Sequence, residues 1–433
     1  MTSNLQVRAG QFNQAARQGA YILIALLLPR LGVPRSVIGQ WETLLFLGYV
    51  LGFGWTTGLL QGFLVRMGDL AGARATRFAR RAVGTTALFS AGLLLAAAAF
   101  HGPLFRLLQL DGEPLGWPFF FLLLFSRWPG FCFEQALLLA GRVGWLTVYS
   151  VANALGLLLS LLLPLYLGHD MLYAMRWLAG FAGAKALGLM LWAWFSSPGP
   201  VEESYPAQMT EWLRQSRPLV AYASVAALVT AVDPWIVNYW SGGDEEVFAI
   251  FRYGVRELPL LAALISGMTV VAIPLIGRDT PAGLDLLRRQ SRQLFHYVFA
   301  LSLLMMLTAH WWWTLVFTPV FADSLPIFRT YLLVVGCRLV FAMTVLTALK
   351  QTRSIYLWGL AELVVNVVLS LALAPRFGLQ GIIWATVIAS YFHELCLVLY
   401  LRFRTGTAWQ SYADLRWYAG YLLVLFGAYY WML

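Results

Sequence analysis

Charged residues are scarce in this sequence. They make up 12% of the 433 residues, whereas about a quarter of the residues in an ordinary soluble domain are charged. Hydrophobic residues make up 60%, and the mean hydropathy is +0.70. A soluble protein of this length needs a polar shell around its core, and this chain has too few polar residues to form one. The composition therefore argues against a soluble enzyme and predicts a surface that faces lipid.

Cysteine and lysine are rare as well. The three cysteines, Cys132, Cys337 and Cys396, lie in apolar runs, which argues against a disulfide framework and against a zinc site. Lys185 and Lys350 are the only lysines, so arginine supplies most of the net charge of +10. Most arginines lie in short loops between apolar runs, where they indicate membrane topology rather than nucleic-acid binding. We expect no metal, no cofactor and no nucleic-acid partner.

Sequence motifs for several common enzyme reactions are absent. No glycine-rich loop ends in Lys-Ser or Lys-Thr, which argues against ATP hydrolysis by this chain. The patterns His-Glu-x-x-His and Gly-x-Ser-x-Gly are also missing. A membrane glycosyltransferase, ligase or polymerase would need a sizeable outside loop with catalytic carboxylates or arginines, and the loops here are short. The chain is therefore predicted not to be an enzyme.

Long apolar runs are abundant instead. A helix needs about 20 mostly apolar residues to cross the hydrocarbon core. The first run continues past Pro29 without a cleavage site, so we expect it to remain as a span. The last run, 417–433, is either a thirteenth span or an interfacial segment. The twelve expected spans are residues 12–31, 37–65, 82–100, 117–140, 145–167, 171–195, 219–240, 247–276, 295–317, 325–349, 354–374 and 379–401.

The two halves of the chain resemble each other at an offset of about 210 residues. This shift pairs Gly168 with Gly378, and a slip of one residue pairs Arg127 with Arg338. Chance similarity between apolar helices is the alternative explanation. Six spans per half is an even number, so both halves would enter the membrane in the same direction, as parallel repeats. We expect a six-helix lobe at 1–195, a cytoplasmic linker at 196–218, a second six-helix lobe at 219–404 and a C-terminal segment at 405–433.

The distribution of arginine orients the predicted bundle. If the N-terminus lies inside, the inner segments carry most of the arginine and lysine residues, and the outer turn at 244–246 carries none. Cytoplasmic loops of membrane proteins show this excess of positive charge. We therefore expect the N-terminus in the cytoplasm.

Several of the expected spans contain charged residues. A charge at the centre of a membrane helix costs about 2.5–3.5 kcal/mol on insertion scales, so each one needs a partner, water or a function. A guanidinium group matches the oxygens of a phosphate, which makes arginines candidates for binding an anionic substrate. The candidate substrate-binding residues are Arg127, Arg252, Arg256 and Arg338. The candidate ion-coupling residues are Glu42, Glu134, Asp233 and Glu257.

Structural explanations remain open for many of these residues. Arg252 lies near the outer end of its span, where its side chain can reach the interface. Arg256 can pair with an acid of another span. Asp233 precedes a proline, so that a helix-capping role competes with ion coupling, and the role of Lys185 is undecided. The His-Glu pair at 393–394 is interpreted as interfacial.

Short segments in both halves carry a family resemblance. They read Leu-Pro-Arg-Leu-Gly at 28–32, Ile-Gly-Gln-Trp at 38–41, Asp-Pro-Trp-Ile-Val at 233–237, Val-Phe-Ala-Ile-Phe-Arg at 247–252, and Pro-Arg-Phe-Gly-Leu-Gln-Gly at 375–381 with Ala-Thr at 385–386. Together they resemble the polysaccharide transporters of the MOP (multidrug/oligosaccharidyl-lipid/polysaccharide) exporter superfamily, the O-antigen flippase type. The resemblance covers residues 12–404.

The resemblance implies an all-α MOP-type fold, in which two six-helix lobes open inward and outward around a cationic cavity. It implies movement of undecaprenyl-diphosphate-linked oligosaccharide from the inner to the outer leaflet of the bacterial inner membrane, coupled to a proton or other ion gradient. The resemblance implies functional roles for three residues of this sequence: Asp233 and the arginines of the eighth span, Arg252 and Arg256. The implied partners are the lipid-linked substrate, membrane lipids and polysaccharide polymerase or assembly proteins.

Two other branches with the same architecture are alternatives. The multidrug and toxin extrusion branch typically places an acidic residue in the first span, and residues 12–31 contain none. This absence disfavours a drug exporter. Lipid II flippases are closer in character, although they usually carry fourteen spans.

Overall fold

The computed structural model describes residues 4–432, apart from residues 69, 71, 111, 196–204, 257–267, 270, 271 and 274. The described part is almost entirely helical and contains no β-strand. Eight of its helical segments are long and apolar enough to cross a membrane. The prediction of an all-α, multi-pass membrane protein is therefore confirmed.

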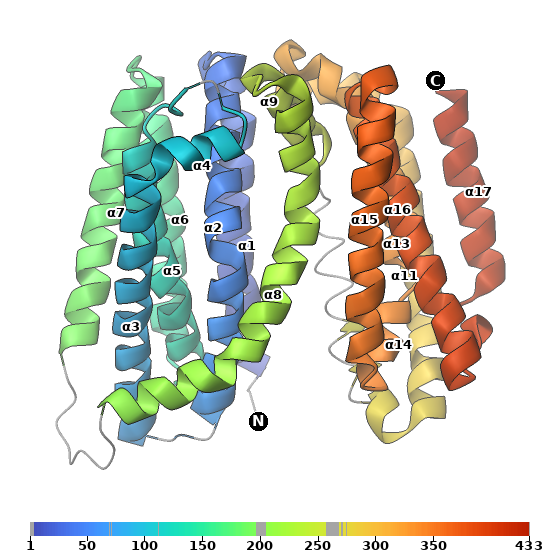
Figure 1. Cartoon of the computed structure of the whole chain (residues 1–433), viewed down its shortest axis with the longest axis horizontal. Helices are drawn as coiled ribbons and strands as arrows, with labels where there is room; N and C mark the ends of the chain where they lie inside the picture. Colours follow the sequence, from blue (N-terminus) through green and yellow to red (C-terminus); the bar gives the residue numbers. More distant parts are fainter. Residues whose placement is uncertain are drawn as a thin grey trace. The chain divides into compact units, whose positions relative to one another are not determined.

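The first of two compact units comprises Met1–Ala231 and Gly242–Glu246. Helix α5 is its central element and packs against α2, α3, α6 and α7, while α1 packs along α6. Figure 1 shows these helices side by side, with the short helix α4 lying across them near one end. The elements are α1 (Asn4–Leu27), η1 (Pro29–Leu31), α2 (Arg35–Gly68), α3 (Gly72–Ala99), α4 (His101–Leu107), α5 (Trp117–Leu139), α6 (Val143–Tyr166), α7 (Met171–Trp194) and most of α8 (Tyr205–Ser241).

The second unit comprises Val232–Ser241 and Val247–Leu433. Helices α15 and α16 form a closely packed hairpin, and α16 also contacts α12, α13 and α14. Gly378 joins the two long helices with a φ of 58°, which glycine adopts without steric cost. Besides the end of α8, the elements are α9 (Glu245–Gly254), α11 (Thr280–Phe317), η2 (Pro319–Ser324), α12 (Leu325–Tyr331), η3 (Leu332–Val334), α13 (Val335–Arg338), α14 (Ala342–Ala348), α15 (Thr352–Phe377), α16 (Leu379–Tyr400), η4 (Leu401–Thr405), η5 (Trp409–Ser411) and α17 (Leu415–Trp431).

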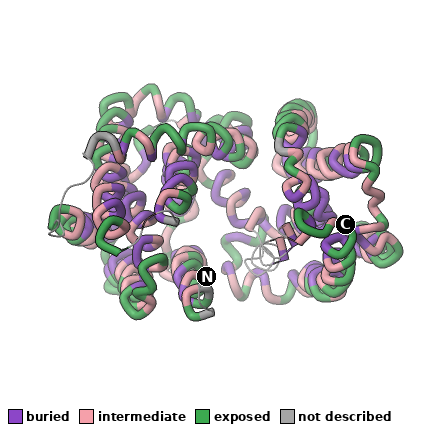
Figure 2. The backbone as a smooth tube through the Cα atoms, turned by 90° about the horizontal axis from the view of Figure 1, so that it is seen from below, coloured by how far each residue is buried: buried purple, intermediate pink, exposed green. Residues whose placement is uncertain are grey.

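The outer faces of the long helices are apolar. On α3, the side chains of Leu88 and Leu95 are 73% and 71% exposed, and on α15 Val364 and Val368 are 55% and 60% exposed. Figure 2 shows exposed residues following the outer sides of the helices, while buried residues gather on the sides that face their neighbours. Rows of exposed aliphatic residues are unfavourable in water and suit a hydrocarbon environment.

Helices α2 and α8 approach each other through a row of glycines. Gly54, Gly58 and Gly62 lie one turn apart on α2, and each is covered by α8. A Cβ atom added at Gly58 would lie 2.4 Å from backbone atoms of Val220. Small residues at such a contact allow two membrane helices to pack backbone against backbone.

Replacing Gly58 with alanine is expected to destabilise the protein by about 1–3 kcal/mol, because the added methyl group forces α2 away from α8. The matched control is Gly92→Ala on α3, where an added Cβ meets no atom within 4 Å. Thermal unfolding of the detergent-solubilised protein should show a lower midpoint for the first variant and an unchanged or higher midpoint for the second. Equal midpoints in the two variants would contradict this account of the helix contact.

The beginning of α8 is part of the first unit. Residues 205–218, which the sequence assigns to a linker, are helical. One of them, Trp212, is fully buried. The indole Nε1 of Trp212 donates to the carbonyl oxygen of Leu59 at 3.2 Å, and its ring meets the rings of Phe63 and Phe78 edge-on. The division between the units lies inside α8, after Ala231. The expected lobe and linker boundaries stay a prediction.

The expected tenth span, 325–349, is not one regular helix. It is divided into α12, η3, α13 and α14, and Phe341 between the last two has a φ of 61°. Phe341 directly precedes α14, and its left-handed backbone is incompatible with a continuous helix from α13 into α14. The stretch is nevertheless long and apolar enough to cross a membrane, as the sequence predicts, but its helix is interrupted. The irregular backbone is tolerated because this segment is largely buried within the protein, where its polar groups find partners.

The last apolar run forms helix α17, which has 17 residues. This length lies at the lower end of the range of about 17–25 residues that cross a membrane. The helix packs along α11, with ring centroids 5.7 Å apart for Phe295 and Tyr418 and 5.4 Å apart for Phe299 and Tyr421. These contacts make α17 a structural part of the second unit.

Candidate functional site

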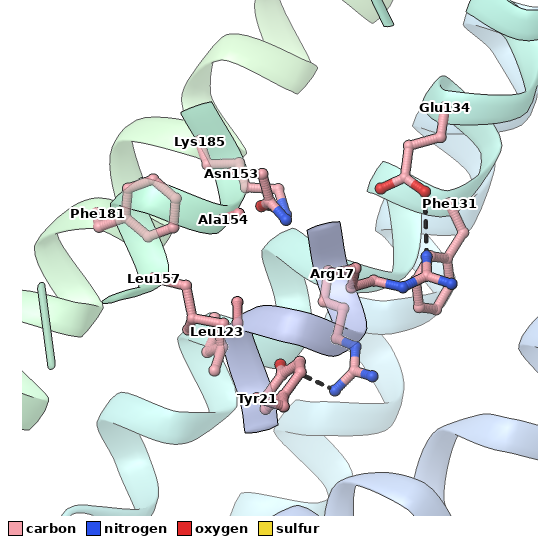
Figure 3. Close-up of a pocket in the computed structure, with 12 residues that line it drawn as sticks. Arg17, Tyr21, Leu123, Phe131, Glu134, Asn153, Ala154, Leu157, Phe181 and Lys185 are labelled. Atoms are coloured by element: carbon pink, nitrogen blue, oxygen red, sulfur yellow. Dashed lines mark hydrogen bonds and ion pairs between the residues drawn. The ribbon is translucent and has the colours of Figure 1, made fainter. Parts of the chain in front are cut away.

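A pocket in the first unit lies among helices α1, α5, α6 and α7 (Figure 3). In this conformation its enclosed space is about 20 Å³, room for about one water molecule, and the pocket opens at its mouth. Four charged residues line it: Arg17, Arg127, Glu134 and Lys185. Three cations face a single carboxylate, which gives the pocket lining a formal charge of +2.

One oxygen of the Glu134 carboxylate is bound by two neighbouring donors. Its Oε2 atom accepts a hydrogen bond from Nδ2 of Asn13 at 2.8 Å and forms an ion pair with Nη1 of Arg17 at 3.1 Å. The hydroxyl of Ser150 donates to Oδ1 of Asn13 and fixes the orientation of that amide. The side chain of Glu134 is 5% exposed. Glu134 is therefore a buried carboxylate that neutralises the partly exposed Arg17 in a hydrogen-bonded pair.

Arg127 is held by neutral groups. Its Nη1 atom donates to the hydroxyl of Tyr21 at 3.2 Å, and its guanidinium lies over the rings of Tyr21 and Phe131 at 5.1 and 5.7 Å. Among the described residues it has no carboxylate partner. Aromatic faces attract a guanidinium without removing its charge, so Arg127 retains donors for an anion.

Lys185 is also held without a carboxylate partner in the described part of the chain. Its Nζ atom donates to Oδ1 of Asn153 at 2.7 Å and lies 5.7 Å from the centre of the Tyr149 ring. Figure 3 shows Lys185 and Asn153 together on one side of the pocket, opposite Glu134. A lysine ammonium has three donors, so one neutral acceptor leaves it able to bind an anion.

The structure brings only two of the eight predicted site residues together in this pocket, namely Arg127 and Glu134. Glu42 is 3% exposed on α2 of the same unit, but it does not line the pocket. Glu257 lies outside the described residues. The role proposed for Glu42 in ion coupling stays a prediction.

The other predicted arginines belong to the second unit. Arg252 lies in the last turn of α9, and the guanidinium of Arg256 lies 4.5 Å above the ring of Tyr253. Arg338 is exposed at the end of α13, next to the interruption of the expected tenth span. Their roles in substrate binding stay predictions.

Asp233 connects three helices of the second unit. Its two carboxylate oxygens accept hydrogen bonds from Nδ2 of Asn366 on α15 at 2.6 Å and from the hydroxyl of Thr386 on α16 at 2.8 Å. Ser370 donates to Oδ1 of Asn366 at 3.1 Å. Helix α8 continues through Pro234 to Ser241, so Asp233 does not cap a helix. The carboxylate instead accepts from side chains of neighbouring helices.

The contribution of Arg17 was not predicted from the sequence. Arg17 falls within the expected first span, 12–31, but it was not among the candidate site residues. Helix α1 begins at Asn4, however, so Arg17 lies more than three turns inside the helix. Its spacing of four residues from Tyr21 was the available signal, because such residues share a helix face. The neutral partners Asn13 and Asn153 have no signal in the sequence.

Comparison with solved structures identifies the architecture. No protein-family model and no curated protein sequence matches the chain. A lipid II flippase MurJ in an inward closed conformation has a TM-score of 0.70 and 13% identity, and the match covers 99% of this chain and 92% of that one. An inward-facing multidrug resistance MATE family transporter of the MOP superfamily has a TM-score of 0.66 and 14% identity, covering 91% and 94%. The fold is that of the MOP superfamily.

A third MOP superfamily transporter, from Pyrococcus furiosus, has a TM-score of 0.63 and 14% identity, and the match covers 93% of this chain and 94% of that one. It is described as having a binding pocket of reverse polarity that suggests a different function. These three proteins are named as flippases or transporters. The expected MOP-type fold is confirmed. Identities this low establish the fold, and the substrate must be argued from the pocket.

Proposed function

We propose that this chain is a flippase for undecaprenyl-diphosphate-linked oligosaccharides, such as O-antigen or exopolysaccharide units. It moves them from the inner to the outer leaflet of the bacterial inner membrane by alternating access, with its N-terminus in the cytoplasm. The observation that carries the proposal is the excess of cations in the pocket of the first unit.

The charge of the pocket suits a diphosphate. Glu134 neutralises Arg17, so Arg127 and Lys185 supply the positive charge that remains for a ligand. A guanidinium binds two phosphate oxygens at once, and an ammonium binds a phosphate as a compact charge. Charged groups within a membrane protein are costly unless they serve a partner or a transport path. A diphosphate in the pocket accounts for both unneutralised cations.

The rest of the pocket suits the sugars of such a substrate. Tyr21, Phe131 and Phe181 present aromatic rings, and Asn153 presents an amide, to the same space. Aromatic rings pack against the apolar faces of sugars, while amides and hydroxyls bind their hydroxyl groups. A lipid tail does not need the pocket, because the apolar outer faces of the helices can contact it.

Two alternative substrates remain within the same fold. The MurJ neighbour is named as a lipid II flippase, and lipid II would also bring a diphosphate to the pocket. A cationic drug, by contrast, would be repelled by a pocket lining with a charge of +2. The cationic pocket therefore favours a lipid diphosphate over the cations expected for a multidrug antiporter.

We assign ion coupling first to Asp233. Asp233 lies on α8, and its carboxylate is bound by side chains from α15 and α16. A change in its charge would therefore act on three helices at once. Glu134 is a weaker candidate, because its charge is needed to neutralise Arg17. Polysaccharide polymerase or assembly proteins would receive the flipped substrate.

The test is a flipping assay in proteoliposomes that contain the full chain. We expect the protein to flip an undecaprenyl-diphosphate-linked oligosaccharide and to leave a small cationic dye in place. A preparation that exports the dye but does not flip the lipid would overturn the proposal and favour a drug exporter. Preference for lipid II over a lipid-linked oligosaccharide without a peptide would reassign the substrate to the lipid II class.

A further inference from the structure

Helices α15 and α16 carry two facing rows of polar residues. The α15 residues are spaced four apart and so share one helix face. The rows pass through the tightly packed hairpin that the two helices form. Their members are Glu362, Asn366 and Ser370 on α15, and Thr386, Ser390, His393 and Glu394 on α16.

Asp233 contacts these rows at Asn366 and Thr386, which bind its carboxylate. Glu362 lies one helical turn from Asn366 on α15. Oε1 of Glu362 accepts a hydrogen bond from the hydroxyl of Ser390 at 3.3 Å, and its Oε2 lies 3.1 Å from Nδ1 of His393. The side chains of His393 and Glu362 are 14% and 19% exposed. The interfacial position expected for the His-Glu pair at 393–394 stays a prediction, and the structure packs its imidazole against a carboxylate of α15.

Two polar atoms of this group are buried without a hydrogen-bond partner among the described residues. They are Nε2 of His393 and Oε2 of Glu394, each with less than 1 Å² of exposed surface. An unsatisfied buried polar atom is costly, and a carboxylate oxygen without a donor is among the least favourable cases. A proton on the carboxyl group removes the charge that makes this arrangement costly. The geometry therefore provides a place for an additional proton.

Within the described part of the chain, the charged groups of neighbouring elements do not neutralise both carboxylates. The charges that act on Glu362 from other helices are those of Asp233 on α8 and Arg338 on α13. Glu394 is subject to the charge of Glu362. Among the described residues, the positive charge that acts on these two glutamates is that of Arg338, and it acts on Glu362. The other titratable groups near the two glutamates are Cys337, Tyr412 and Tyr418.

We propose that Glu362, His393 and Glu394 form a proton-binding site, linked to Asp233 by the polar rows of α15 and α16. Imidazole and carboxyl groups exchange protons with one another, and hydroxyl groups between them can pass protons on. The coupling ion is then a proton. The proton-binding site stands on the contacts of the second unit alone, whereas its part in transport rests on the proposed flippase function.

Proton binding is tested first on the purified full chain without substrate. Infrared difference spectra across a pH titration should show the carbonyl band of a protonated carboxylic acid. The band should weaken in Glu362→Gln and in Glu394→Gln, and it should shift along the pH axis in His393→Asn, which remains informative if a glutamate variant does not fold. The control is Glu113→Gln, which alters a second His-Glu pair, that of His101 and Glu113, whose side chains are 36% and 59% exposed.

A band that is absent, or one that survives unchanged in all three variants, would overturn the proton-binding site whatever the protein transports. Coupling is then tested in proteoliposomes by comparing flipping with and without a pH gradient. We expect Glu362→Gln to lower the gradient-driven rate about tenfold, which corresponds to about 1.4 kcal/mol, while flipping without a gradient changes little. If the infrared band is lost but the gradient dependence of flipping does not change, the coupling role is overturned. If the wild type does not flip the lipid at all, the result counts against the proposed function instead.

Discussion

Arg127→Ala is expected to lower the rate of flipping of an undecaprenyl-diphosphate-linked oligosaccharide about 10- to 100-fold. A hydrogen bond to a charged group contributes about 1.5–3 kcal/mol, and each 1.4 kcal/mol corresponds to about a factor of ten. Arg127 is held by Tyr21 and Phe131, neither of which neutralises it, so its charge is available to the diphosphate. Lys185→Ala should act in the same direction, because Lys185 also has a neutral partner, Asn153.

The control for both variants is Arg176→Ala. Arg176 lies on α7 with Lys185, but it is exposed rather than lining the pocket. Flipping by this variant should match the wild type, and thermal unfolding should confirm that all three variants are folded. Arg127→Lys should recover part of the lost rate, because it restores the charge without the planar guanidinium. Wild-type flipping by a folded Arg127→Ala protein would contradict the assignment of the diphosphate to this pocket.

Asp233→Asn is expected to abolish the response of flipping to an ion gradient. The amide is the same size as the carboxylate and can still bond Asn366 and Thr386, but it has no charge to gain or lose. Flipping without a gradient should change little. Asp233→Ala should also lower stability, by about 1–3 kcal/mol, because the donors of both partners lose their acceptor.

The control for this prediction is Asp285→Asn on α11. The side chain of Asp285 is 52% exposed and pairs with Arg289 at the surface, where such pairs contribute little to stability. Proteoliposome flipping should be measured with each variant at equal internal and external ion concentrations and then under a gradient. A full gradient response by Asp233→Asn would show that the coupling carboxylate lies elsewhere.

Hydropathy predicted most of the helices because membrane insertion depends on a local property. Each run near 20 apolar residues is favourable in lipid by itself, whatever the rest of the chain does. The runs at 117–140 and 145–167, for example, correspond closely to α5 and α6. Hydropathy also identified the apolar segment at 325–349, but it does not register the left-handed conformation of Phe341, where the helix is interrupted. It also started the first helix too late, because the polar first turns of α1 carry no apolar signal.

The site was predicted less completely because its chemistry depends on pairs of residues far apart in the chain. Glu134 was predicted as an ion-coupling acid from its place in a span, but its partners Asn13 and Arg17 lie on another helix. Arg127 was predicted to bind an anion, and the structure adds Lys185 to the same pocket. Periodicity within one helix shows which residues share a face, but not which face of another helix they meet.

The sequence by itself determined that this protein is a helical membrane protein with charges placed inside its spans, since composition and hydropathy are sums over single residues. Tertiary structure alone decided which of those charges are neutralised. Packing of α1 against α5 and α6 gave Arg17 a carboxylate and left Arg127 and Lys185 with neutral partners. Packing of α8, α15 and α16 turned Asp233 into a link between three helices. The free energy of a buried charge depends on its neighbours, and only the folded chain specifies them.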